Sequence, residues 1–237
     1  MDTNTPIFHC QDLTKSYGAT MALAGIGFSV PRGRILGLLG PNGSGKTTLI
    51  KLMTGMLVPD AGTLTIDGYA PGIETRRVIS YLPDRNSLDR DMSFEMCCHL
   101  FSDFYDDFDP VRAYEMLKSL GISPTARFKS LSKGNKEKVQ LILAMSRNAK
   151  LYLLDEPIAG VDPATRDYIL NTIISNYNPE ATIILSTHLI QDVEKILDDV
   201  LFLMNGSIVL YNSADEVRTQ RGMSIDEVFR EVFRYAQ

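Results

Sequence analysis

The spacing of apolar residues changes along this chain and divides it into regions of different predicted structure. Between residues 7 and 38, short apolar runs are broken by Gly and Pro, a pattern typical of several strands joined by turns. Residues 47–57 carry apolar side chains at helical spacing, and residues 63–68 predict another strand and turn.

Helical spacing then dominates residues 93–149, in three stretches of amphipathic sequence. Two uninterrupted apolar runs follow at 151–156 and 182–188, with a helical stretch at 163–177 between them. An order of strand, helix and strand predicts a parallel sheet, so we expect residues 85–149 to form a helical insertion in it.

Length and composition narrow the class of protein. The 237 residues suffice for one sizeable α/β domain with an inserted subdomain, but not for two average domains. The net charge of −5 argues against a broad basic surface, so we expect no nucleic-acid partner. Three cysteines, two of them adjacent, make no framework of secreted disulfides and fit a reducing cytosol. The N-terminus lacks the features of a signal peptide, and no run approaches the roughly 18 apolar residues of a spanning helix, so we expect any link to a membrane to run through another chain.

A glycine-rich segment, "GPNGSGKTT" at residues 40–48, joins a predicted strand to a predicted helix. Gly40, Gly45, Lys46 and Thr47 match the phosphate-loop pattern G-x-x-x-x-G-K-[ST] in the structural context that it requires. The glycines let successive N–H groups turn toward a phosphate chain, and the helix N-terminus adds its positive dipole end. We expect Lys46 to reach the β and γ phosphates of a triphosphate and the Thr47 hydroxyl to ligate Mg²⁺.

Two acids end the apolar run "LYLLDEP" and supply candidate chemistry. Asp155 can hold Mg²⁺ through water, and Glu156 can polarise the water that attacks the phosphate. Two acids alone fit a solvated strand end equally well, but the phosphate loop favours the catalytic interpretation. His188 ends the next apolar run at the same sheet edge, where its imidazole can touch a γ-phosphate, although a lone histidine there is usually structural.

Guanine-nucleotide switches also have a phosphate loop, but "NKEK" at residues 135–138 lacks the Asp of their base-reading motif, so this class is not expected. Over nearly its whole length the chain instead resembles the ATP-binding cassette (ABC) ATPases. Six motifs stand in the family's order: "LTKSYG" with Tyr17 where the family stacks an aromatic on adenine, "GPNGSGKTT" (Walker A), "LSKGN" at 131–135 (L-S-G-G-Q), "LLDEP" (Walker B), "AGVDP" (D-loop) and "STH" (H-loop).

The resemblance implies an α/β fold with a P-loop NTPase core on a parallel sheet, an N-terminal antiparallel β subdomain and an inserted helical subdomain. We expect one ABC ATPase domain, with the nucleotide-binding core at 1–84 and 150–212, the helical subdomain at 85–149 and C-terminal helices at 213–237.

The resemblance also implies a paired mechanism, in which ATP on the Walker A of one cassette is completed by the L-S-G-G-Q segment of a second one. Ser132 and the backbone around Gly134, which open a predicted helix, would supply donors to that phosphate. The expected nucleotide-binding residues are Tyr17, Gly40, Pro41, Asn42, Gly43, Ser44, Gly45, Lys46, Thr47, Thr48, Ser132 and Gly134; the catalytic ones are Lys46, Glu156 and His188; the metal ligands are Thr47, Asp84 and Asp155.

Three residues depart from the family's pattern. Asp84 stands in a loop where the family often has Gln, and its carboxylate can bind Mg²⁺ more strongly but adds negative charge beside the phosphates. Lys133 replaces the first Gly of L-S-G-G-Q and Asn135 its Gln. The Lys133 ammonium either contacts a phosphate or points to solvent. ATP hydrolysis is still expected, because Lys46 and the other catalytic residues are present.

Features outside these motifs are weaker. Cys97, Cys98 and His99 are consecutive in a predicted helix, so they cannot converge on one metal ion. "FSDFYDDFDP" fits a solvated helix end, or a partner contact, because this subdomain borders the membrane subunit in the ABC family. A capping box at Ser224 and Glu227 predicts a packed C-terminal helix, whose sequence resembles tails of drug-exporter ATPases.

These inferences predict the ATP-binding and ATP-hydrolysing subunit of an ABC transporter, with ATP and Mg²⁺ as cofactors and export as the direction. The expected partners are a second cassette, identical or different, and separate transmembrane permease subunits. The expected location is the cytoplasm, peripheral on the inner face of the cell membrane. The alternatives are a soluble ABC ATPase of cofactor assembly and a scaffold that binds ATP without hydrolysing it.

Overall fold

The computed structural model describes residues 5–85, 87–176 and 178–234, so the outermost residues of the predicted segments 1–84 and 213–237 lie outside the described residues. Three strands form an antiparallel sheet in the order β2-β1-β4: β1 (Phe8–Tyr17), β2 (Thr20–Val30) and β4 (Ala61–Ile66). Six strands form a larger sheet in the order β5 (Ile79–Leu82), β6 (Leu151–Asp155), β7 (Thr182–Thr187), β3 (Ile35–Leu39), β8 (Asp199–Met204) and β9 (Ser207–Ser213).

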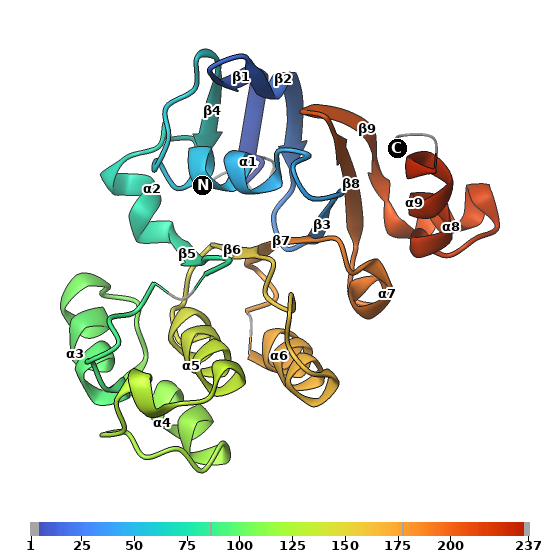
Figure 1. Ribbon diagram of the computed structural model, residues 1–237. Coiled ribbons are helices and arrows are strands. Elements are labelled where there is room, and N and C mark those ends of the chain that lie inside the picture. The colour runs from blue at the N-terminus through green and yellow to red at the C-terminus, as the bar shows by residue number, and fades with distance from the viewer. Residues whose placement is uncertain (1–4, 86, 177, 235–237) are drawn as a thin grey trace.

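The helices cover both faces of the larger sheet. They are α1 (Lys46–Met53), α2 (Ile73–Val78), α3 (Phe94–Phe104), α4 (Pro110–Ser119), α5 (Lys133–Met145), α6 (Pro163–Asn176), α7 (Ile190–Val193), α8 (Ala214–Arg221) and α9 (Ile225–Phe233), with a 3₁₀ turn at Phe128–Ser130. Figure 1 shows α1 between the two sheets and α5 and α6 on the opposite face of the larger one. Helices on both faces explain why β3, β6 and β7 are buried at every residue and read as uninterrupted apolar runs.

The predicted parallel core is confirmed in the larger sheet, which adds one antiparallel strand at its edge. Strands β5, β6, β7, β3 and β8 pair in parallel, but β9 pairs antiparallel with β8. The cause is local: Asn205 and Gly206 both adopt positive φ, which suits a tight hairpin turn between the last two strands. A two-residue connection of this kind permits only antiparallel neighbours.

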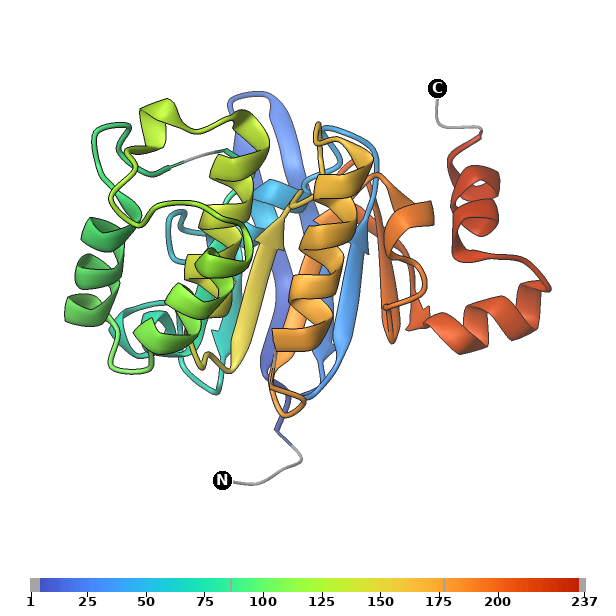
Figure 2. The ribbon, with the colours of Figure 1, turned by 90° about the horizontal axis from the view of Figure 1, so that it is seen from below.

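The helical segment that follows β5 has its own apolar core. Residues of α3, α4 and α5 bury side chains against one another, among them Phe94, Leu117 and Val139. Cys97 and Cys98 point into this core while His99 is exposed, as the consecutive helical positions predicted. The described residues contain no group of three His, Cys, Asp or Glu that could hold a metal ion. Figure 2 shows these helices beside α6, on the side of the sheet away from the C-terminal helices.

One helix end differs from the sequence prediction, and another confirms it. The first helix ends at Met53 rather than 57, because Gly55 adopts φ 70°, in the left-handed region that terminates helices. The predicted capping box is present at the last helix, where Ser224 and Glu227 bond to each other's backbone N–H groups. Behind it, Phe229 packs edge-on against Phe202 of β8.

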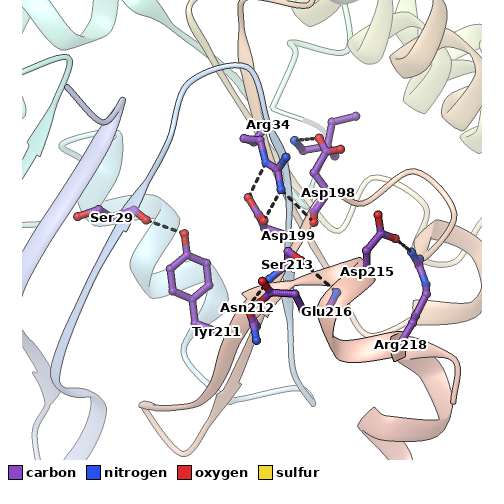
Figure 3. Close-up of polar contacts among 11 residues, drawn as sticks. Ser29, Arg34, Asp198, Asp199, Tyr211, Asn212, Ser213, Asp215, Glu216 and Arg218 are labelled. Carbon is purple, nitrogen blue, oxygen red and sulfur yellow. Dashed lines mark hydrogen bonds and ion pairs between the residues drawn. The ribbon is translucent and has the colours of Figure 1, made fainter. Parts of the chain in front are cut away.

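Polar contacts at the amino ends of β3 and β8 fasten the base of the sheet (Figure 3). Arg34 donates to both carboxylate oxygens of Asp199, at 3.0 and 2.7 Å, and so joins two neighbouring strands. The Tyr211 hydroxyl of β9 donates to the backbone oxygen of Ser29 in β2, at 2.6 Å, and links the two sheets. The opposite, carboxyl end of the parallel strands is left for the site.

Candidate nucleotide site

The loop between β3 and α1 folds as it does because two of its positions have no space for a side chain. A Cβ on Gly40 would lie 2.4 Å from the Leu203 backbone oxygen, and one on Gly45 would lie 2.4 Å from that of Ala22. Gly45 also has φ 112°, which L side chains rarely adopt. No side chain caps α1. Its first N–H groups are therefore open to an anion, as predicted for a phosphate loop.

Lys46 is buried at the first position of α1. Its ammonium donates to the backbone oxygens of Gly40 (2.8 Å) and Pro41 (3.1 Å). It also lies 3.3 Å from a carboxylate oxygen of Glu156. A cation is thus held inside the curve of the loop, where a phosphate chain would meet it.

Asp155 lies fully buried at the carboxyl end of β6. Its Oδ1 accepts from the hydroxyls of Ser186 (2.5 Å) and Thr47 (3.2 Å). Its Oδ2 is buried and has no hydrogen-bond partner among the described residues. Burial raises the pKa of Asp155, and the nearby negative charges of Asp84 and Glu156 act in the same direction. A buried carboxylate oxygen without a partner, beside a threonine hydroxyl, is a donor set that fits Mg²⁺.

Glu156 connects the other candidate catalytic groups. Its backbone has φ 49°, an unusual conformation for a residue other than glycine, and its N–H donates to the backbone oxygen of Ser186 at 3.1 Å. One carboxylate oxygen faces Lys46, as described above. The other lies 3.0 Å from Nδ1 of His188, which donates to it in the tautomer that carries the proton there. The two acids, the lysine and the histidine therefore meet at one sheet edge.

Tyr17 ends β1 close to the loop. It pairs with Thr20 across the turn into β2. Two residues after Thr20, the backbone oxygen of Ala22 lies against Gly45 of the phosphate loop. Its side chain is 49% exposed, so a flat ring can stack on its face. Pro41, Asn42 and Gly43 are also exposed, at the tip of the loop.

The segment "LSKGN" stands apart from the phosphate loop of its own chain. Ser132 is the N-cap of α5 and accepts from the backbone N–H of Asn135 at 3.2 Å. Gly134 packs against α6, where a Cβ would come within 3.1 Å of the Thr165 hydroxyl. Among the described residues, no hydrogen bond or ion pair joins residues 132–135 to residues 40–48.

Asp84 lies near the site without entering its hydrogen-bond network. Its carboxylate is 3.8 Å from Arg85 and is 38% exposed. Its charge is close enough to raise the pKa of Asp155. Among the described residues, Asp84 forms no hydrogen bond or ion pair with Thr47 or Asp155. The structure thus brings Asp84 to the edge of the predicted metal site and leaves its role as a ligand a prediction.

Comparison with known proteins shows the family of the chain. The sequence profile of the ABC transporter family matches residues 23–159, more than half of the chain. The chain belongs to this family. Its ABC ATPase fold is shared by a solved ATP-binding subunit of an ABC transporter, which has a TM-score of 0.85 and 31% sequence identity and covers 95% of this chain and 98% of its own.

Relatives of this ABC ATPase include subunits of export systems. The Nod factor export ATP-binding protein I of Ralstonia nicotianae is 30% identical over 95% of this chain and 73% of its own length. The daunorubicin resistance ATP-binding protein DrrA3 of Streptomyces coeruleorubidus is 29% identical over 92% of this chain and 72% of its own. The predicted ATPase subunit of an ABC transporter is confirmed, and the cofactor-assembly alternative is not favoured.

Sequence reasoning missed two parts of this ABC ATPase site. Ser186, inside an apolar strand, bonds both to Asp155 and, through its hydroxyl, to the N–H of Glu156 at 3.0 Å. A lone serine in the buried run before His188 was the available signal. The second is a contact of Lys133, whose side chain is largely exposed and whose ammonium donates to the Gly160 backbone oxygen at 3.1 Å.

Replacing Asp84 with Ala tests its predicted contact with the metal. If the carboxylate ligates Mg²⁺ directly or through water, the Mg²⁺ concentration for half-maximal ATPase activity should rise by about tenfold. The measurement is a Mg²⁺ titration of activity at fixed ATP, with Asp103→Ala, an exposed acid on α3, as the control. An unchanged midpoint would remove Asp84 from the metal site.

Proposed function

We propose that this chain binds ATP with Mg²⁺ and hydrolyses it to power export through separate membrane-spanning subunits, working as one of two paired cassettes. The observation that carries the proposal is the meeting of Lys46, Asp155 and Glu156 at one sheet edge, with a buried Asp155 oxygen that lacks a partner. The export direction is supported by relatives named for Nod factor export and daunorubicin resistance. We also propose that the domain divides as the sequence predicts, with a helical subdomain at residues 85–149 and C-terminal helices at residues 213–237.

The residues have separate proposed roles. Lys46 and the open N–H groups of α1 bind the phosphates, and Tyr17 stacks on the base. Asp155 and the Thr47 hydroxyl hold Mg²⁺, which supplies charge neutralisation at the phosphates when bound. The Glu156 carboxylate accepts a proton from the attacking water, while His188 orients that carboxylate and lies within reach of the γ-phosphate.

Pairing is proposed because the site is incomplete within one chain. Ser132 and the N-terminus of α5 present donors that reach no group in residues 40–48 of the same chain. A second cassette, facing the first head to tail, would bring these donors to the phosphate. ATP would then hold the pair together, and hydrolysis would release it.

The membrane partner is proposed to dock on a groove between the sheet and the helical segment. The groove has a volume of about 660 Å³ and is lined by apolar side chains such as Met56, Phe101 and Tyr105, with Lys51 and Arg76 among its cations. Beside it, Met96, Leu100 and Phe104 recur every four residues on α3, and all three are exposed, Phe104 to 74%. This surface supports the expected partner contact at "FSDFYDDFDP".

The location follows from that partner. The described residues contain no helix that is long and apolar enough to cross a membrane. All three cysteines are buried and free. We place the chain on the cytoplasmic, inner face of the cell membrane, held there by the spanning subunits.

Phe104→Asp tests the membrane partner without touching the nucleotide site. Co-purification from detergent with co-expressed membrane-spanning subunits should fall by about tenfold, because a charge replaces apolar contact. ATPase activity of the isolated chain should stay at the parent level. Ile174→Asp, an exposed apolar residue on α6, is the matched control. Full retention of the spanning protein by Phe104→Asp would place the docking surface elsewhere.

A separate outcome bears on the ATPase activity itself. If the parent chain bound ATP but never hydrolysed it, the result would favour a scaffold.

A further inference from the structure

Lys133 makes a contact that joins α5 to the loop before α6. It is the first residue of α5, and its ammonium donates to the backbone oxygen of Gly160, in the loop before α6, at 3.1 Å. Gly160 has φ 70°, and a Cβ there would lie 3.0 Å from that same ammonium nitrogen. Glycine at this position therefore gives the backbone its left-handed turn and lets the lysine approach.

The loop that Lys133 contacts is the one that follows Glu156. At its start, the Glu156 N–H is bonded to Ser186, and the Ala159 N–H donates to the Glu156 backbone oxygen at 3.1 Å. At its end, Asp162 accepts from the backbone N–H and the hydroxyl of Thr165 in the first turn of α6, at 3.0 and 2.7 Å. Between these two ends, the Lys133 contact holds the loop from outside.

Lys133 also has a second partner on its own helix. Its ammonium lies 3.8 Å from the Glu137 carboxylate, one helical turn along α5. The other Glu137 oxygen is buried and has no hydrogen-bond partner among the described residues. Glu137 therefore keeps the ammonium over the start of α5, within reach of the Gly160 oxygen, even though the lysine itself is largely exposed.

We propose that Lys133 is a positioning residue for Glu156 of the same chain. Through the Gly160 oxygen it fixes the path of residues 157–162 and hence the direction of the Glu156 carboxylate. Because Lys133 adjoins Ser132, the inference rests on the proposed pairing: a shift of α5 on meeting the phosphate of the second cassette is transmitted by this contact to the loop. The two half-sites of one chain are thereby linked.

The test removes the ammonium and keeps the length of the side chain. Lys133→Met should lower kcat by about fivefold, while KM for ATP changes by less than about twofold. Lys133→Arg, which keeps a donor, should restore most of the loss. Lys118→Met is the control, because Lys118 is an exposed lysine in the last turn of another helix, α4. A parent-like kcat in Lys133→Met would overturn the proposal.

A second measurement separates positioning from phosphate binding. In a Glu156→Gln background, Lys133→Met should leave the ATP-dependent pair intact, because the ammonium holds a backbone oxygen and not the phosphate. Loss of the pair would mean that Lys133 is a phosphate ligand and would overturn the positioning role. Gly160→Ala places a Cβ 3.0 Å from the ammonium and also strains the left-handed turn, so it should lower kcat at least as much as Lys133→Met does.

Failure of this inference can be told from failure of the proposed function. If the parent chain does not hydrolyse ATP, and the Glu156→Gln variant does not dimerise when ATP is added, the proposed function and this inference both fail. If the parent chain turns over and the variant pairs, but Lys133→Met and Gly160→Ala each keep the parent kcat, only the role of Lys133 falls.

Discussion

Glu156→Gln is expected to lower ATP turnover by about 10²-fold or more, the usual scale for loss of a general base. The substitution keeps the size and hydrogen bonding of the side chain and removes its charge. ATP affinity should be retained or should rise, because the carboxylate lies 3.3 Å from the Lys46 ammonium and competes with phosphate for it. Steady-state ATPase assays and equilibrium ATP binding measure the two effects separately.

The same variant should also trap the paired state. Since hydrolysis no longer separates the cassettes, an ATP-dependent dimer should accumulate that the parent chain forms only briefly. Size-exclusion chromatography with light scattering, in Mg²⁺ and ATP, detects it, and adding Ser132→Arg should abolish it by placing bulk against the phosphate.

Glu231→Gln, an exposed acid on α9, is the control for the Glu156 experiments. Normal hydrolysis by Glu156→Gln would remove Glu156 from the mechanism. A variant that loses turnover but stays monomeric at high protein concentration would keep the catalytic role and point to a different cassette as the partner.

The carboxyl edge of the sheet could be predicted because its signals are local. The runs that became β3, β6 and β7 are apolar throughout, and each is followed directly by the phosphate loop, by Glu156 or by His188. Parallel strands bring their carboxyl ends to one edge, so the meeting of these groups follows from strand order alone. The structure adds the register, in which Asp155 stands opposite Ser186.

Most of the remainder depends on packing that the sequence does not encode locally, and one part had a local signal. Strand β5 has only four residues, too few for an alternating pattern to be distinguished. The pairing of β8 with β9 had a local signal in Asn205 and Gly206, which sequence reasoning did not use. The contact between Lys133 and Gly160 joins residues 27 positions apart and arises only when α5 packs against α6. Asp84 lies between these cases, because its loop was predicted but the direction of its carboxylate was not.

Lys46→Ala is expected to weaken ATP binding severely and to abolish measurable turnover. The ammonium is buried inside the loop. There it donates to the backbone oxygens of Gly40 and Pro41, which occupy the donors that a phosphate would otherwise take. When phosphate enters, the lysine can exchange these neutral acceptors for charged ones, which are about twice as strong. Alanine leaves the helix N-terminus in place, so some affinity for phosphate should survive, but the charge that stabilises transfer is lost.

Two measurements on Lys46→Ala decide the assignment of the phosphate site. Binding of a fluorescent ATP analogue gives the loss of affinity, and phosphate release gives the loss of turnover. Lys118→Ala, an exposed lysine in the last turn of α4, is the control for removing a lysine from a helix. The melting temperature should fall, because removal of Lys46 leaves the partly buried Glu156 carboxylate without its cationic partner, so circular dichroism is used to confirm that the variant is folded at the assay temperature. Turnover near the parent level in a folded Lys46→Ala protein would show that the nucleotide phosphates bind elsewhere, and the site built on residues 40–48 would have to be abandoned.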